Sequence, residues 1–131
     1  MPQIAIDTNA YVAYLKNQKQ VVGHFREADS VIVPYIVIAE LYHGFFRGSK
    51  ATENLQTLNE FLSSPRMSVI YPDEITTLNF GEIATELANA GKPMQQNDIW
   101  IAAICKQHGY PLLTLDNGFR NIIGLKLLPL K

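Results

Sequence analysis

Four acidic residues stand at well-separated places in the 131-residue chain, each within or beside an apolar segment: Asp7, Glu40, Asp98 and Asp116. Ionised carboxylates about 4 Å apart repel by something like 4 kcal/mol per pair at an effective dielectric near 20. Such a group is stable when divalent cations lie among its members, and ligation by oxygen alone suits Mg²⁺ or Mn²⁺ rather than Zn²⁺. If the fold brings the four acids together, they predict metal-assisted hydrolysis.

Taken one at a time, three of the acids have ordinary structural explanations. Asp7, in the segment Ile6-Asp7-Thr8-Asn9, suits the N-cap of a helix. Asp98 precedes an apolar helical segment, where the helix dipole favours an acid. Asp116 begins Asp-Asn-Gly, a sequence typical of tight turns. The functional interpretation therefore depends on the combination of the four acids and not on any single motif.

Glu40 is the acid that structural roles explain least. Its predicted helix, from Pro34 to His43, is apolar on nearly every side, and no Lys or Arg lies within one turn of it. A buried carboxylate without a partner is costly, so we expect a metal ion to be that partner. Glu40 and His43 also form one E-x-x-H pair, but carboxylate-bridged di-iron bundles need two such pairs, which excludes that kind of site.

Short β-branched runs alternate with segments of helical periodicity, and together they predict the elements that carry the acids. We expect strands over residues 3–6, 31–33, 67–71 and 111–115, with a further edge strand over 126–128. We expect helices just after Asp7, over about 21–28, from Pro34 in a first turn to about Phe46, over 55–62, around 80–88 and over 99–106.

This alternation predicts an α/β fold with a mostly parallel central sheet covered by helices on both faces. Such sheets bind ligands beyond the carboxyl ends of their strands. Asp7 and Asp116 each follow a predicted strand, so we expect both at that edge of the sheet. Glu40 and Asp98 lie on helices whose ends can face the same edge.

The composition predicts one globular domain over residues 1–131. An apolar fraction of 47% with 18% charged residues excludes a disordered chain, and no apolar run approaches the roughly 20 residues of a membrane span. The first residues lack the pattern of a secretory signal. The single cysteine, Cys105, cannot close an internal disulfide. We therefore expect a cytoplasmic protein without a membrane segment, in which Cys105 is a buried structural thiol.

The charge balance is 11 Lys and Arg against 12 Asp and Glu. With the four candidate acids set aside, the remaining surface is mildly basic, which suits a polyanionic substrate, although a mixed-charge surface explains the same numbers. Contacts with a nucleic-acid backbone would fall to basic side chains such as Lys16, Arg47, Lys50, Lys92 or Arg120.

The segments around the four acids resemble those of the PIN-domain nucleases, and within them the VapC-type toxins of prokaryotic toxin–antitoxin pairs. They occur in the family's order and spacing over essentially the entire chain, and the four together are specific. The matching segments are Ile6-Asp7-Thr8-Asn9, Ala39-Glu40-Leu41-Tyr42-His43-Gly44, Asn97-Asp98-Ile99-Trp100-Ile101-Ala102-Ala103 and Leu113-Thr114-Leu115-Asp116-Asn117-Gly118-Phe119.

The resemblance implies a three-layer α/β/α sandwich, endoribonuclease activity, and Mg²⁺ or Mn²⁺ held by the four acids. It implies that Thr8, Asn9 and Thr114 orient those acids, a role that metal sites generally require. The implied partners are an RNA substrate, a cognate antitoxin and a second copy of the chain in a homodimer. Gly118 departs from the family, whose members often carry a polar or acidic residue there, and this puts the tuning of the site in doubt.

Two other functions are compatible with parts of the pattern. A phosphatase of the haloacid-dehalogenase type would use Asp7 as its nucleophile, but it needs an acid two residues later, where this chain has Asn9. A PIN-fold module that binds RNA or protein without turnover is the second alternative. All four acids are present, so the sequence gives no sign that catalysis has been lost.

Overall fold

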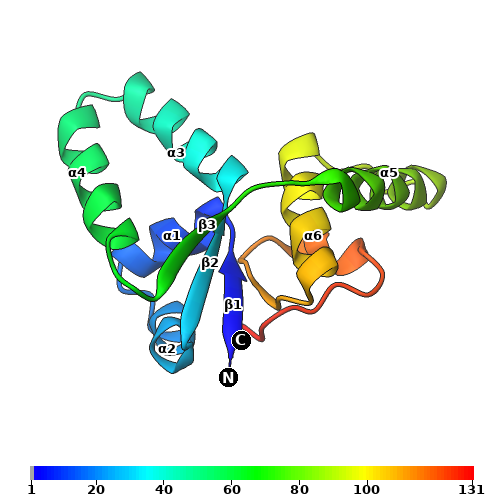
Figure 1. The fold of residues 1–131 in the computed structure, drawn as a ribbon, viewed down its shortest axis with the longest axis horizontal. Helices are drawn as coiled ribbons and strands as arrows, with labels where there is room; N and C mark the ends of the chain where they lie inside the picture. The colour runs from blue at the N-terminus through cyan, green and yellow to red at the C-terminus, as the bar shows by residue number, and fades with distance from the viewer. Residues whose placement is uncertain (1) are drawn as a thin grey trace.

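Four short parallel strands form the central sheet: β1 (Gln3–Ile6), β2 (Ser30–Pro34), β3 (Met67–Ile70) and β4 (Leu112–Leu113). Their order in the sheet is β3-β2-β1-β4 (Figure 1). The structure, a computed structural model, describes residues 2–131. Three of the four residues of β1 and four of the five residues of β2 are buried, which explains why these segments read as continuous apolar runs. The predicted parallel sheet is confirmed.

Helices cover the sheet on both sides. They are α1 (Thr8–Leu15), α2 (Lys19–Glu27), α3 (Tyr35–Arg47), α4 (Ala51–Leu62), α5 (Glu74–Asn89), α6 (Gln96–His108) and the 3₁₀ helix η1 (Asn117–Asn121). Figure 1 shows α1, α2 and α4 on one side of the strands and α5 and α6 on the other. The predicted three-layer α/β/α arrangement is therefore confirmed. None of the helices within residues 2–131 has the length and apolar character needed to cross a membrane.

Several predicted boundaries were wrong, and three of them have a clear physical reason. Pro34 ends β2 and is the N-cap of α3, so it precedes the first turn of that helix. The strand expected over residues 111–115 covers only Leu112 and Leu113, because the Thr114 hydroxyl accepts the N–H of Asp116 and turns the chain out of the ladder. The segment 126–128 forms a single parallel bridge, between Leu112 and Leu127, and Pro129 then offers no N–H to extend it.

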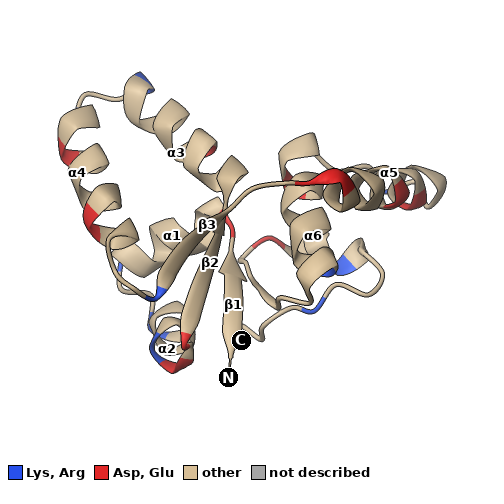
Figure 2. Ribbon diagram, in the orientation of Figure 1, with Lys and Arg blue, Asp and Glu red and all other residues tan. Residues whose placement is uncertain are grey.

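The topology creates a switch point between β1 and β4. The chain runs from β1 to β2 on one side of β1 and later returns to β4 on the other side. Open parallel sheets hold their ligands in the crevice at such a point, beyond the carboxyl ends of the strands. Asp7 follows β1 here and Thr114 follows β4. Figure 2 shows acidic residues at this end of β1, with many of the Lys and Arg residues around α2 and in the C-terminal segment.

Helix α6 is the most deeply buried helix, and it fixes the position of Asp98 in its first turn. Ile99 and the run from Ile101 to Cys105 are buried, and Trp100 packs on Phe80 of α5 with ring centroids 4.4 Å apart. Cys105 is 1% exposed, and burial raises the pKa of its thiol to about 12. The prediction of a buried structural thiol is confirmed.

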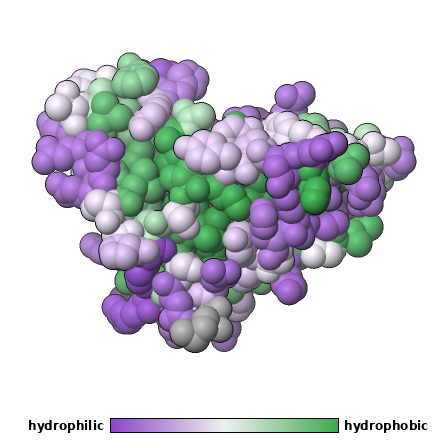
Figure 3. Space-filling model, viewed as in Figure 1, coloured by the Kyte–Doolittle hydropathy of each residue, from purple (hydrophilic) through white to green (hydrophobic). Residues whose placement is uncertain are grey.

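A second feature is an apolar groove beside α3, α4 and β3, which we call the α3–α4 groove. It has a volume of about 310 Å³ and is lined by Tyr35, Ile38, Ala39, Tyr42, Leu62, Val69 and Tyr71. Figure 3 shows hydrophobic side chains gathered over this part of the surface, bordered by hydrophilic ones. Phe46, one turn beyond Tyr42, is 66% exposed. The apolar face of α3 is therefore only partly used by the core.

Candidate active site

Asp7 is buried at the end of β1, and its two carboxylate oxygens have separate partners. Oδ1 accepts the N–H of Ala10 at 2.9 Å, which caps α1, and Oδ2 accepts the hydroxyl of Thr114. The side chain is only 3% exposed. Burial raises the pKa of Asp7 to about 6, and the nearby acids Asp98 and Asp116 add to this rise. Capping therefore uses one oxygen only, and the other is held at the end of β4.

Glu40 is half-buried in the second turn of α3 and is held by two polar side chains. Its Oε1 accepts the Thr8 hydroxyl at 2.7 Å, and its Oε2 accepts the Asn97 amide at 3.4 Å. The sequence showed no Lys or Arg within one turn of Glu40, and both hydrogen-bond partners in the structure come from other helices. Thr8 and Asn97 lie 32 and 57 residues away in the sequence, so helical spacing could not reveal them.

Asp98 and Asp116 complete the set of predicted acids. Asp98 is half-buried, and burial raises its pKa, with Asp116 and Glu40 adding to the rise. Asp116 is exposed in the turn after β4, where its Oδ1 accepts the N–H of Gly118 at 2.8 Å. Its own N–H donates to the Thr114 hydroxyl at 3.0 Å, so Thr114 contacts both Asp7 and Asp116.

Electrostatic interaction joins these side chains into one group, which we call the acid cluster: Asp7, Glu40, Asp98 and Asp116. Asp98 interacts with each of the other three, and Asp7 also interacts with Asp116. Within residues 2–131, no Lys or Arg is among the groups that shift the pKa of Asp7 or Asp98. The fold therefore brings together four acids from distant parts of the chain and leaves two of them without a cationic partner.

The donor atoms of the acid cluster fit a hard divalent cation held partly through water. All of them are carboxylate oxygens, with hydroxyl and amide groups behind them. In the described part of the chain, no three His, Cys, Asp or Glu side chains are grouped closely enough to enclose one ion by themselves. Mg²⁺ usually keeps several waters and takes only one or two carboxylates directly, whereas structural zinc needs a closed set of four ligands.

Two of the three residues predicted to orient the acids contact an acid: Thr8 donates to Glu40 and Thr114 donates to Asp7. Asn9 is exposed on the first turn of α1, and its role stays a prediction. Asn97 donates to Glu40, a contact that was not predicted from the sequence. The sequence feature that could have indicated this contact is the position of Asn97 next to Asp98, in the first turn of a helix that is otherwise strongly apolar.

Comparison with known proteins shows which proteins this chain resembles. The PIN domain family model matches residues 4–125. Ribonuclease VapC1 of Haemophilus influenzae (strain R2866) is 30% identical over 101 residues, which are 74% of each chain. The tRNA(fMet)-specific endonuclease VapC of Salmonella typhimurium is 26% identical, and the match covers 97% of each chain. PIN-domain ribonucleases of the VapC type generally depend on divalent metal ions.

The fold matches as well as the sequence. The structure of VapBC2 from Rickettsia felis, bound to a DNA fragment from their promoter, contains a chain that superposes with a TM-score of 0.85 at 27% identity, over 96% of this chain and 97% of that one. The match extends across the helices and strands that position the acid cluster, and a phosphatase with Asp7 as its nucleophile finds no support in it. The chain belongs to the PIN-domain family and, within it, to the VapC-type toxins.

Proposed function

We propose that this protein is the toxin of a toxin–antitoxin pair and acts as an endoribonuclease that hydrolyses RNA phosphodiester bonds at the acid cluster with Mg²⁺, for which Mn²⁺ can substitute. One observation carries the proposal. Four carboxylates interact at the switch point of a parallel sheet, and no Lys or Arg is among the groups that act on Asp7 or Asp98 within residues 2–131. Such an arrangement favours a bound cation over the empty, fully ionised cluster.

In this mechanism Asp7, Asp98 and Asp116 would hold the cation, directly or through water. When bound, a divalent cation supplies positive charge that neutralises the reacting phosphate and acidifies an attacking water. The chain's own contribution is to fix the carboxylates beforehand. The Ala10 N–H and the Thr114 hydroxyl fix Asp7, and a carboxylate held by two donors needs little reorganisation during the reaction.

Glu40 has a different role in the proposal. Its oxygens are held by Thr8 from α1 and by Asn97 from α6, so the carboxylate is oriented by two other elements of the fold. A carboxylate in this position can align the attacking water and accept its proton. Alternatively, the same carboxylate oxygens of Glu40 would bind a second cation.

The activity is tested with purified protein and total cellular RNA, with a tRNA fraction as a second substrate. We expect cleavage with Mg²⁺ or Mn²⁺, none with a chelator, and a loss on the order of 10³-fold in the Asp7→Asn variant, since it removes a charge that the cation needs. Asp73→Asn is the matched control, because Asp73 also caps a helix through its Oδ1 but lies outside the acid cluster.

Three outcomes of this experiment are informative. New RNA ends that appear with wild type and the Asp73→Asn variant but not with the Asp7→Asn variant support the proposal. Equal cleavage by wild type and Asp7→Asn would point to a contaminating nuclease and overturn the catalytic role of this chain. Folded wild type that binds RNA without cutting it would favour the non-catalytic PIN module.

We propose further that the protein acts in the cytoplasm as a homodimer and that a cognate antitoxin covers the α3–α4 groove. The support is the apolar lining of that groove and the exposed Phe46 beside it. Over-expression of the chain alone should slow growth, and co-expression of the antitoxin should restore it. Normal growth in the presence of soluble, active protein would contradict the toxin role. Light scattering of the purified chain tests the dimer.

A further inference from the structure

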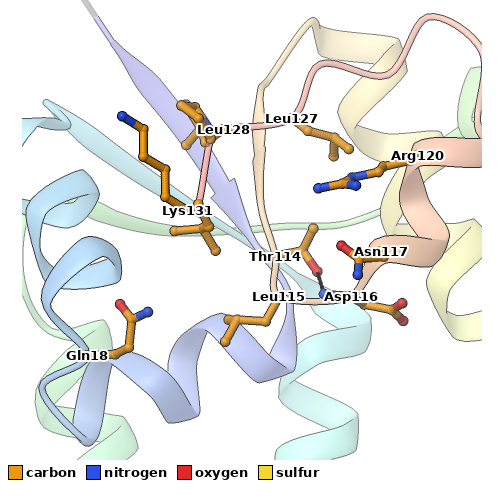
Figure 4. Close-up of a pocket in the computed structure, with 11 residues that line it drawn as sticks. Gln18, Thr114, Leu115, Asp116, Asn117, Arg120, Leu127, Leu128 and Lys131 are labelled. Carbon is orange, nitrogen blue, oxygen red and sulfur yellow. Dashed lines mark hydrogen bonds between the residues drawn. The ribbon is translucent and has the colours of Figure 1, made fainter.

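A pocket of about 420 Å³ opens beside the acid cluster on the side of Asp116 (Figure 4). Three segments that are distant in the sequence form its walls. One is the turn after β4 with the start of η1, the second is the C-terminal segment, and the third is the connection between α1 and α2. The lining residues used below are Leu115, Asp116, Asn117, Arg120 and Leu127.

The C-terminal wall is held in place by hydrogen bonds to two elements. The N–H of Leu128 donates to the carbonyl of Leu112 in β4 at 3.0 Å. On the other side, His24 Nε2 donates to the carbonyl of Pro129 at 2.8 Å, and Gln20 Oε1 accepts the N–H of Lys131 at 2.7 Å, both from α2. The pocket is therefore bounded by a segment that is tied to the sheet and to a helix.

The pocket is lined by two cationic side chains, Arg120 and Lys131, together with amide, hydroxyl, carboxylate and several aliphatic groups. Figure 4 shows the Arg120 guanidinium pointing into the pocket above the Asn117 amide, while the Asp116 carboxylate points away from the guanidinium. Leu115 and Leu127 supply apolar surface on two walls, and Leu115 is 44% exposed. A phosphate suits the planar fork of an arginine, an amide suits the polar edge of a base, and aliphatic groups suit its face.

We propose that this pocket binds the nucleotide of the RNA substrate that lies next to the scissile phosphodiester, with Arg120 at its phosphate and Leu127 against its base. The inference rests on the proposed function, since the acid cluster defines where the scissile bond lies. Continuity with Asp116 is the link between the two sites. Of the five basic residues that the sequence offered for backbone contacts, only Arg120 lines the pocket, whereas Lys16, Arg47, Lys50 and Lys92 do not.

The inference is tested by RNA binding without turnover. The Asp7→Asn protein is titrated against a fluorescein-labelled single-stranded oligoribonucleotide, and anisotropy is recorded at several salt concentrations. Adding Arg120→Ala should weaken binding about 3- to 30-fold and make the slope of log affinity against log salt shallower by about 0.7, because one phosphate contact is lost. Arg26→Ala, which removes an exposed arginine of α2 outside the pocket, should change neither.

A second variant covers the case in which Arg120→Ala does not fold. Asn117→Asp keeps the size of an exposed side chain and adds a negative charge inside the pocket, so it should weaken RNA binding at least as much. Asn54→Asp, on the exposed face of α4, is its control. Arg120→Lys should recover part of the affinity, since it keeps the charge and loses only the paired donors.

The results separate this inference from the proposed function. If wild type cuts RNA but the Arg120→Ala and Asn117→Asp variants bind RNA like their controls, the proposal of a nucleotide pocket alone is overturned. The pocket would then bind another occupant, such as a polypeptide. Wild type that neither cuts nor binds RNA overturns both proposals. In the active background, Arg120→Ala should raise KM more than it lowers kcat, which a residue needed only for folding would not do.

Discussion

Asp7 and Asp116 follow neighbouring strands at the same edge of the sheet, yet their surroundings differ. Asp7 follows β1, which has a neighbouring strand on each side, and its side chain is 3% exposed with two hydrogen-bond donors. Asp116 comes after β4, an edge strand of two residues, and is exposed with its carboxylate held within its own turn. A central strand thus yields a fixed, buried acid, and an edge strand yields an accessible one.

This difference indicates how the acid cluster can be both rigid and adaptable. Burial makes the ionised form of Asp7 costly, and the pKa of Asp7 is raised to about 6 as a result. A cation that binds there relieves the cost, so cation binding and folding stability should be strongly linked at Asp7. At Asp116 water already solvates the carboxylate. Cation binding or loss of the charge at Asp116 should therefore affect activity without much effect on folding stability.

The strongest test of this comparison is the pH dependence of stability in the presence of a chelator. The pKa of Asp7 is about 6 in the folded protein against 3.8 for the ordinary group, so between these values the folded chain binds more protons than the unfolded chain. The free energy of unfolding should therefore fall by about 3 kcal/mol as the pH rises from about 4 to about 6, and stay low above that range. Urea unfolding at a series of pH values measures this.

The Asp7→Asn variant is the control, because an amide cannot ionise. It should lack most of this fall, and at pH 7.5 without divalent ions it should be more stable than wild type. Burial also raises the pKa of Asp98. Asp98 therefore adds a smaller fall in the free energy of unfolding over the same pH range, and this fall remains in the variant. Saturating Mg²⁺ should raise the midpoint of wild type and leave that of the variant nearly unchanged. An equally steep fall in the variant would show that Asp7 is not the group responsible.

The second test concerns Asp116, the exposed acid of the pair. Asp116→Asn should lower RNA cleavage on the order of 100-fold, because it removes one negative charge from the acid cluster. Its free energy of unfolding should stay within about 0.5 kcal/mol of wild type at low pH, because the carboxylate is exposed, and should rise slightly at high pH, because Asp116 no longer repels ionised Asp7 and Asp98. Cleavage rates and urea unfolding of the same preparation check both parts. A stability change as large as that of Asp7→Asn would remove the distinction between the two strand ends.

The sequence predicted the four acids and the sheet edge because both follow from local patterns. Strands read as apolar runs, and parallel strands end at one edge, so Asp7 and Asp116 could be placed together without coordinates. The order of their burial could not be predicted, since it depends on how many strands flank each one. The expected strand over residues 111–115 would have made β4 as regular as β1, and the turn begun by Thr114 shortened it.

The partners of Glu40 show a second limit of sequence reasoning. An apolar helix correctly suggested that no neighbour on α3 balances this carboxylate, but Thr8 and Asn97 reach it from two other helices. Contacts between elements depend on side-chain directions that periodicity does not contain. The pocket beside Asp116 could not be predicted from the sequence either. The C-terminal segment that forms one of its walls has little regular secondary structure, a single strand bridge between Leu112 and Leu127.

The smallest expected effect concerns Gly118, in the turn that follows Asp116. A Cβ at Gly118 would lie 3.1 Å from Oδ1 of Asp116, the oxygen that accepts the Gly118 N–H, and 3.7 Å from Cε of Met94. Gly118→Ala should therefore displace the Asp116 carboxylate by a few tenths of an ångström and raise the Mg²⁺ concentration for half-maximal cleavage about 3-fold. Stability should change little, because the carboxylate is exposed and its only side-chain hydrogen bond among the described residues lies within its own turn.

Gly81→Ala on α5 is the control, since a Cβ there meets no atom within 4 Å and alanine favours a helix. It should leave the Mg²⁺ dependence unchanged and stabilise the fold by about 0.5–1 kcal/mol. A wild-type Mg²⁺ dependence in Gly118→Ala would mean that the exposed acid tolerates displacement because solvent and the cation reposition it. In that case the rigidity of the acid cluster would reside in the buried Asp7 alone, and the contrast between the two strand ends would be sharper than the burial of their side chains indicates.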